Sequence, residues 1–267
     1  MKVPMLSIVF MVLNLLIGIL IPLVLAICFK KKYKASLLAF FVGCLVMFVF
    51  AFVLEQMVHA LVLFVLPFGK AMQCSFWIMA VYGGLMAALF EETGRLLSMR
   101  FWLGKKFSDP HNALMYGAGH GGLEAFVILS MGMINNIIYS VCINTGATEI
   151  LLAPLDEANK QTLQAAFDTL TQTSPLLFLA SPIERFAAVT AQIGLSVLVW
   201  FAATKVGKMK WYVVALVFHF TLDALAVILS GLGMSIALIE VVVWILALVI
   251  AYTAWMVWKK ETGALQE

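Results

Sequence analysis

Three apolar stretches of the sequence carry charged or histidine side chains at spacings that place them on one face of a helix. In the first stretch, Arg95 follows Glu91 by four residues and Glu92 by three. Side chains three or four residues apart are neighbours on a helix, so the arginine can ion-pair with either carboxylate and hold it ionised. One ion pair needs only one carboxylate. The second adjacent carboxylate in an apolar helix therefore indicates a chemical role.

The other two stretches repeat a single spacing. His120 and Glu124 are four residues apart, and so are His219 and Asp223. A histidine with a carboxylate one helical turn away suits a metal ligand or an imidazole oriented by its acid. Four glycines within 117–122 surround the first histidine. Glycine allows another helix or a substrate backbone to approach closely, so this run indicates a crowded, functional segment.

The elements that position these residues must be membrane-spanning helices. The 267-residue chain is 64% hydrophobic and 12% charged, whereas a soluble domain carries about 25% charged residues. The sequence contains several continuous apolar runs of about 18 or more residues, long enough to cross a bilayer. Such runs cross as helices, because every backbone polar group must be satisfied in lipid. We predict an all-α transmembrane bundle. Its seven expected spans are 5–29, 36–58, 74–99, 112–138, 183–204, 211–231 and 234–258.

The basic residues predict the orientation of the bundle. With the N-terminus outside, twelve Lys and Arg residues fall in inner loops and three in outer segments, which favours a cytoplasmic C-terminus. We therefore expect a multi-pass protein of the cell membrane, in contact with membrane lipid. Because the basic residues cluster in short loops between spans, a nucleic-acid partner is not expected.

The domain organisation is predicted to be simple. The spans leave no room for a soluble domain, so residues 1–267 are expected to form a single integral membrane domain. The one long loop, 139–182, then lies outside. Leu163, Phe167 and Leu170 follow one another at helical spacing with polar residues between them, which predicts an amphipathic helix lying in the membrane interface.

Depth connects the three stretches. Glu91, His120 and His219 each lie nine residues from a marker at the inner end of the predicted span that contains it. At about 1.5 Å per residue, all three sit roughly 13 Å below the inner surface. Since three separate helices place an acid or a histidine at one depth, we expect a single site.

The chemistry that suits this set is hydrolysis. Two histidines and paired carboxylates can bind zinc with an open coordination position, and a nearby glutamate can accept the proton of the activated water. A remaining histidine or aspartate can stabilise a developing oxyanion. The residues alone leave two alternatives open. One is a proton- or ion-coupled transporter, although no inverted repeat is visible; the other is a non-catalytic membrane scaffold or immunity protein.

The motifs also resemble a known family. Glu-Glu-x-x-Arg at 91–95, Gly-x-Gly-His-Gly-Gly-x-Glu at 117–124 and His-x-x-x-Asp at 219–223 are similar to the YhfC family of intramembrane metalloproteases. That family resembles the PrsW proteases and, more distantly, the CAAX prenyl endopeptidase and bacteriocin-processing superfamily. The resemblance implies a membrane-embedded peptidase for membrane-associated peptide or protein substrates, with zinc or a metal-free glutamate mechanism.

The resemblance also implies which residues act. Paired carboxylates would work with the first histidine to activate water, while the second histidine and its aspartate complete the site. The expected catalytic residues are Glu91, Glu92, Arg95, His120, His219 and Asp223. The expected metal ligands come from His120, His219, Glu91, Glu92 and Glu124.

Three further polar residues lie within predicted spans or next to the end of one. Glu55 and His59 fall near the outer end of the second span, where long polar side chains are expected to reach toward the interface. Gln192 lies in the fifth span and is expected to hydrogen-bond within the bundle.

The predicted orientation can be tested by accessibility labelling. In a background that lacks Cys28, Cys44, Cys74 and Cys142, single cysteines replace Lys105 or Lys160. We expect a membrane-impermeant maleimide to label Lys160→Cys from outside intact cells, and Lys105→Cys only after the cells are opened, because the two positions lie in loops of opposite predicted sides. Labelling of both positions from the same side would contradict the orientation.

Overall fold

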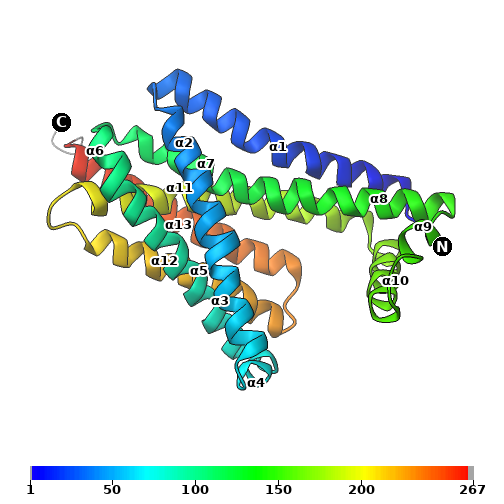
Figure 1. Ribbon diagram of the computed structural model, residues 1–267. Coiled ribbons are helices and arrows are strands. Elements are labelled where there is room, and N and C mark those ends of the chain that lie inside the picture. Colours follow the sequence, from blue (N-terminus) through cyan, green and yellow to red (C-terminus); the bar gives the residue numbers. More distant parts are fainter. Residues whose placement is uncertain (1, 264–267) are drawn as a thin grey trace. The chain divides into compact units, whose positions relative to one another are not determined.

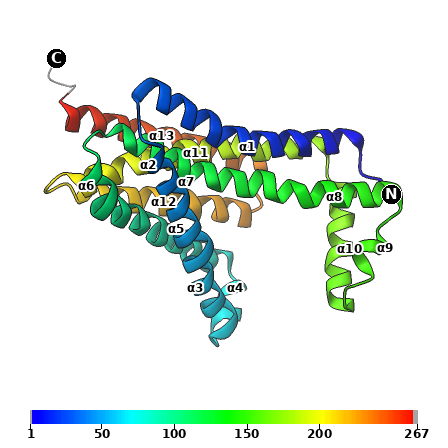
Figure 2. The ribbon, with the colours of Figure 1, turned by 45° about the horizontal axis from the view of Figure 1, so that its top comes forward.

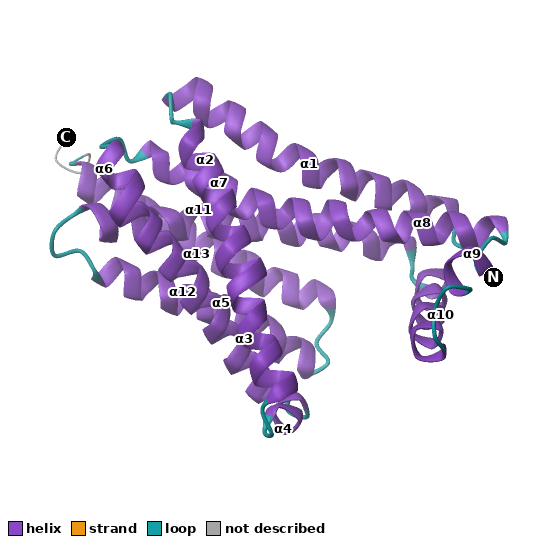
Figure 3. Ribbon diagram, in the orientation of Figure 1, coloured by secondary structure: helices purple, strands orange, loops and turns teal. Residues whose placement is uncertain are grey.

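A computed structural model describes residues 2–263, and every regular element in that part of the chain is helical (Figures 1 and 3). The all-α fold class is thereby confirmed. The α-helices are α1 Met5–Tyr33, α2 Leu37–Val46, α3 Gln56–Ala60, α4 Gly69–Gln73, α5 Phe76–Ser98, α6 Gly104–Lys106, α7 His111–Ala125, α8 Gly132–Thr145, α9 Glu149–Leu152, α10 Glu157–Gln172, α11 Ala180–Thr204, α12 Lys210–Gly231 and α13 Ile236–Thr262. Wider π-helical segments are η1 Met47–Glu55, η2 Leu61–Val65, η3 Met99–Leu103 and η4 Phe126–Met131, and η5 Pro175–Leu179 is a 3₁₀-helix.

Six helical segments between residues 2 and 263 are long and apolar enough to cross a membrane. They are Met5–Tyr33, Leu37–Val65, His111–Thr145, Pro175–Thr204, Lys210–Gly231 and Ile236–Thr262. Helix α5, the third predicted span, is not among them. Its 23 residues are enough to cross the hydrocarbon core, but it carries the charged triad of Glu91, Glu92 and Arg95. The count of seven spans therefore stays a prediction.

The described residues divide into two compact units, and the single membrane domain over 1–267 likewise stays a prediction. One unit contains the described part of Met1–Ile21 together with Ala125–Arg185. Within it, α8 and α10 pack together (Figure 2), and Tyr139 makes an edge contact with Phe167. The predicted amphipathic helix is thus present as α10, with Phe167 and Leu170 buried. Its position in a membrane interface is untested.

The expected loop 139–182 is shorter than predicted, because α8 continues to Thr145 and α11 begins at Ala180.

The second unit contains Pro22–Glu124 and Phe186–Glu267 up to its last described residue, and it holds all the predicted site residues. The backbones of its helices approach one another closely. A Cβ atom at Gly84 would lie 3.0 Å from backbone atoms of Phe220 and Ala224, so α5 and α12 approach closely along their length. The absence of a side chain at Gly84 thus permits the close contact between these two helices.

The glycines around His120 serve the same purpose for α7. A Cβ atom at Gly119 would lie 2.0 Å from the carbonyl oxygen of Phe40 on α2, and one at Gly117 would lie 2.6 Å from the Cα of Ile193 on α11. No side chain fits at either distance. Helix α7 is thereby held between α2 and α11, and the ring of His120 is fully buried.

This close packing predicts a difference between two glycine-to-alanine variants. Gly119→Ala should lower the midpoint of thermal unfolding, because the added methyl overlaps backbone and overpacking costs about 1–3 kcal/mol. Gly83 on α5 has no atom within 4 Å of its virtual Cβ, so Gly83→Ala should leave the midpoint unchanged or raise it. Thermal unfolding of both variants in detergent measures this. Equal midpoints for the two would contradict the packing of α7 against α2.

Candidate active site

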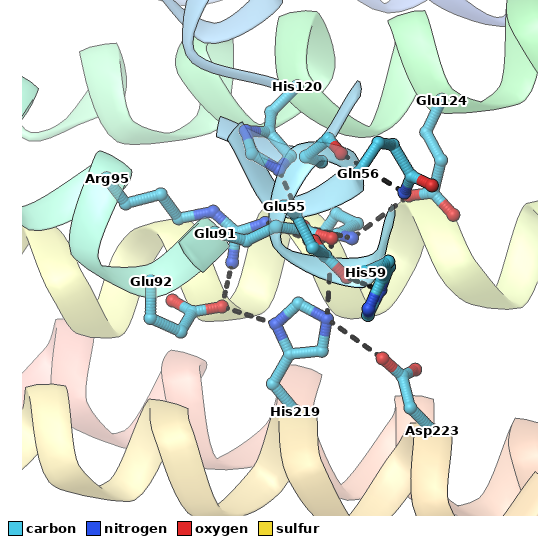
Figure 4. A network of polar contacts seen from close by, with 12 residues as sticks. Glu55, Gln56, His59, Glu91, Glu92, Arg95, His120, Glu124, His219 and Asp223 are labelled. Atoms are coloured by element: carbon cyan, nitrogen blue, oxygen red, sulfur yellow. Dashed lines mark hydrogen bonds and ion pairs between the residues drawn. The ribbon is translucent and has the colours of Figure 1, made fainter. Parts of the chain in front are cut away.

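The predicted site residues converge from three helices inside the second unit (Figure 4). Helix α5 supplies the paired glutamates and the arginine, α7 supplies the first histidine, and α12 supplies the second. Glu91, His120 and His219 are 6%, 0% and 2% exposed, respectively. The structure therefore brings together side chains that the sequence separates by more than 120 residues.

Glu91 occupies the centre of this cluster, with one imidazole facing each of its oxygens. Its Oε2 lies 2.8 Å from Nε2 of His120, while its Oε1 lies 3.9 Å from Nε2 of His219. The first distance is a hydrogen bond. The second is too long for one, although water can bridge polar groups across such a distance. Glu91 is thus held through Oε2, while its Oε1 faces His219 across a gap that a water molecule can bridge.

His219 is fixed from its opposite nitrogen. Its Nδ1 lies 2.7 Å from Oε1 of Glu92, and Glu92 is itself paired with Arg95. Because a carboxylate paired with arginine accepts hydrogen bonds only, this contact assigns a proton to Nδ1. The other nitrogen, Nε2, then points toward Glu91 and lies 3.4 Å from Oδ2 of Asp223. Asp223 is the more open member of this group, with 37% of its side chain exposed.

Arg95 joins the two glutamates to a fourth helix. It pairs directly with Glu92, lies 3.3 Å from Oε2 of Glu91 and donates to the side-chain oxygen of Gln192 on α11. The guanidinium group is fully buried. A buried charge of this kind requires partners, and Arg95 has three. The carboxylate that it contacts most directly is Glu92.

Gln192 confirms the expectation that it hydrogen-bonds within the bundle. Its Nε2 atom donates to Glu91 Oε2 at 3.2 Å and to Glu124 Oε2 at 3.0 Å. Glu124 therefore enters the network through Gln192, whereas the contact of His120 Nε2 is with Glu91. The four-residue spacing of His120 and Glu124 placed both in the site but did not reveal these partners.

The expectation that Glu55 and His59 reach toward the interface is wrong for Glu55. This carboxylate is 6% exposed and lies within electrostatic range of Glu91 and His219. Its Oε1 is 3.1 Å from Nε2 of His59, whose Nδ1 is 2.9 Å from the hydroxyl of Tyr82. Glu55 ends the π-helical segment η1. Such segments are rare in proteins, and those that occur are often found at functional sites.

The assumption that the second span is a regular α-helix could not predict that Glu55 faces the site. A π-helix advances its side chains by a different angle per residue, so the face on which Glu55 lies does not follow from 3.6-residue periodicity. One signal was available in the sequence. Glu55 and His59 are four residues apart, the same spacing that marks the histidine–carboxylate pairs on α7 and α12.

The donor types of this site suit zinc. Two imidazoles and a carboxylate form a common ligand set for catalytic zinc, and Glu92 orients His219 through Nδ1 as a carboxylate orients a metal-binding histidine. Nδ1 of His120 is buried without a hydrogen-bond partner in the described residues. Among residues 2–263, however, no three His, Cys, Asp or Glu side chains stand in an arrangement that could hold a metal ion. These candidate ligand groups instead hydrogen-bond to one another. Their chemical types therefore suit zinc, but their positions in this structure do not form a zinc site.

The ion-pair arrangement predicts a large stability difference between two arginine variants. Arg95→Met leaves Glu91 and Glu92 buried without their counter-charge and should destabilise the protein by about 3–5 kcal/mol. Arg100 is exposed, and its Nη1 lies 3.7 Å from the sulfur of Met209, so Arg100→Met should change stability by less than about 0.5 kcal/mol. Chemical denaturation in mild detergent measures both. Equal stabilities would show that Arg95 does not compensate buried carboxylates.

Comparison with known proteins identifies the relatives of this chain. The sequence model of the family described as "YhfC intramembrane metalloprotease" matches residues 17–245, a range that includes all three motifs. A curated relative from Bacillus subtilis (strain 168), "Uncharacterized membrane protein YhfC", is 39% identical over 257 residues, covering 96% of this chain and 97% of the relative. No solved structure matches. With its candidate spans, the chain is a multi-pass membrane protein, and it belongs to the YhfC intramembrane metalloprotease family.

Proposed function

We propose that this protein is a membrane-embedded endopeptidase that hydrolyses peptide bonds of membrane-associated proteins or peptides. The observation that carries the proposal is the position of Glu91, a nearly buried carboxylate with an imidazole facing each oxygen. A carboxylate that is oriented on one side and open on the other has the geometry of a general base. The family description, which names intramembrane metalloproteases, supports the same reaction.

In this proposal, the attacking water lies between Glu91 Oε1 and His219 Nε2, whose separation of 3.9 Å a water molecule can bridge. Glu91 accepts a proton from the water, and the oxygen attacks the carbonyl carbon of the scissile bond. The C–N bond then breaks, and Glu91 returns the proton to the departing amine. His120, Arg95 and Gln192 hold the other oxygen of Glu91 throughout.

The remaining residues have positioning and electrostatic roles. Glu92 fixes the ring of His219 through Nδ1 and is itself held by Arg95. His219 then presents Nε2 toward the reacting carbonyl, where a donor stabilises the oxyanion that forms on attack. Asp223, the more exposed side chain, lies next to Nε2 and adjusts the charge on that ring. Glu92 and Arg95 lie on α5, and His219 and Asp223 lie on α12; these two helices pack side by side.

A zinc ion would be held by His120 and His219, with Glu92 or Glu124 as the carboxylate ligand when Glu91 is the base; Glu91 is the other candidate ligand, and its neighbour Glu92 would then accept the proton. When bound, it would lower the pKa of the attacking water and polarise the substrate carbonyl. A metal-free route through Glu91 alone is the competing mechanism for the same reaction. Both routes need the two histidines in place and Glu91 between them, so they share the same essential residues.

A proton- or ion-coupled transporter is the competing function. The observation that favours it is the continuation of the acidic network to Glu55, His59 and Tyr82, because chains of ionisable residues inside membranes also form proton relays. Purified protein in liposomes distinguishes the two. A transporter moves protons or ions down an imposed gradient and cleaves nothing, whereas a peptidase cleaves its substrate without a gradient.

The peptidase proposal predicts the effect of one substitution. Glu91→Gln keeps the size and most hydrogen bonds of the side chain but removes the base, so cleavage should fall by at least about 100-fold. The assay uses proteoliposomes containing membrane-anchored reporter peptides with cleavable bonds at several depths. Elution volume in gel filtration and the thermal midpoint should match those of the unsubstituted protein.

The matched control is Glu157→Gln. Glu157 is an exposed glutamate at the start of α10, so this variant should keep full activity. Full activity of Glu91→Gln would refute the assignment of the base. Cleavage only at the outer reporter position would refute the expectation, drawn from the depth of the site, that substrate enters from the cytoplasmic side.

A further inference from the structure

A cavity lies in the same unit as the candidate active site but is lined by different residues. It has a volume of about 360 Å³ and is lined by residues of α7, α11 and α13 and by the last residue of α1, Tyr33. Ligand pockets begin at about 300 Å³. Its walls are mostly apolar, with Ile193, Val197 and Ala254 among the aliphatic residues, and none of the catalytic residues lines it. The proposed peptidase reaction makes no use of this cavity.

Stacked aromatic rings form one wall of the cavity. The ring of Tyr33 lies parallel to that of His111, with centroids 4.5 Å apart, and His111 meets Trp258 edge-on at 5.1 Å. Trp255 also lines the cavity and is 48% exposed. Tyrosine and tryptophan favour the level of the lipid headgroups, where one part of the ring is apolar and another is wet. The wall therefore has the composition of a membrane interface.

Two lysines lie over rings of this wall. Lys32 Nζ is 5.0 Å from the centre of the Tyr33 ring, and Lys259 Nζ is 4.0 Å from that of Trp255. Each belongs to the last turn of its helix, α1 or α13. An acidic side chain also contacts the wall, because Oδ1 of Asp109 is 2.7 Å from Nδ1 of His111. The two lysines do not line the cavity but lie over rings that do, and an apolar cavity beside basic side chains fits an amphiphile that carries a negative charge.

We propose that this cavity binds an anionic phospholipid of the membrane leaflet that borders it. An acyl chain would occupy the aliphatic interior, and the phosphate would contact Lys32 and Lys259. Basic pockets between membrane helices bind anionic headgroups in this way. The aliphatic interior excludes free phosphate as the sole occupant, and the two lysines favour an acidic headgroup over a zwitterionic one. The predicted orientation places this edge on the cytoplasmic side, where anionic lipids attract basic residues.

Native mass spectrometry of the purified full-length protein tests the proposal. The protein is delipidated and then offered an equimolar mixture of phosphatidylglycerol and phosphatidylcholine with the same acyl chains. We expect preferential retention of phosphatidylglycerol. Lys32→Gln or Lys259→Gln should each lower that preference about fivefold, since a lysine near a membrane surface contributes about 1 kcal/mol. Inorganic phosphate should not displace the lipid.

Two further variants make the test specific. Lys105→Gln with Lys106→Gln removes two charges from α6, which does not line the cavity, and should leave the preference unchanged. Ala251→Leu narrows the cavity and should reduce retention of both lipids. Equal retention of the two lipids by the unsubstituted protein would overturn the proposal. So would an equal effect of the α6 variant and the Lys32 and Lys259 variants. Because Glu91→Gln should bind lipid normally, this result is independent of proteolytic activity.

Discussion

Arg95 carries a full positive charge with no exposed surface, and it lies between two carboxylates of its own helix. Removing one partner of a buried ion pair costs about 3–5 kcal/mol, because the remaining charge has no solvent to stabilise it. The glutamates and the arginine of α5 are therefore interdependent. Glu92 contacts His219 and Glu91 contacts His120, so both histidine contacts depend on carboxylates that Arg95 also contacts.

The scaffold around this charge is built to bring backbones close together. Gly117 and Gly119 allow α7 to contact α11 and α2 at distances that no side chain would permit, and Gly84 does the same for α5 and α12. Membrane helices gain little from burying apolar surface, so small residues and polar contacts account for much of their association. The same glycines that hold the helices together therefore fix the distance between the two histidines and Glu91, and this links the stability of the unit to the geometry of its site.

The parts of the site that follow local helical geometry could be predicted from the sequence. The spacing of Glu91, Glu92 and Arg95, and the common depth of His120 and His219, needed only the 3.6-residue repeat and a rise of about 1.5 Å per residue. Partner choice between helices could not be predicted in this way. Glu124 contacts Gln192 on α11, and this pairing depends on how α7 and α11 cross. Glu55 was expected at the interface because it falls near the outer end of the second predicted span, and the sequence did not reveal that the segment it ends, η1, is π-helical.

The central proposal is that His120, His219 and Glu91 act together in a zinc-dependent hydrolytic site, and metal analysis of the purified protein tests it most directly. Inductively coupled plasma mass spectrometry should find about one zinc ion per chain, as expected for a single mononuclear site. The Glu157→Gln variant should retain this zinc, while His120→Ala and His219→Ala should each lose most of it. The account would be contradicted by protein that contains no metal, cleaves its reporter and keeps that activity in a strong chelator. It would also be contradicted by zinc that remains bound after both histidines are replaced.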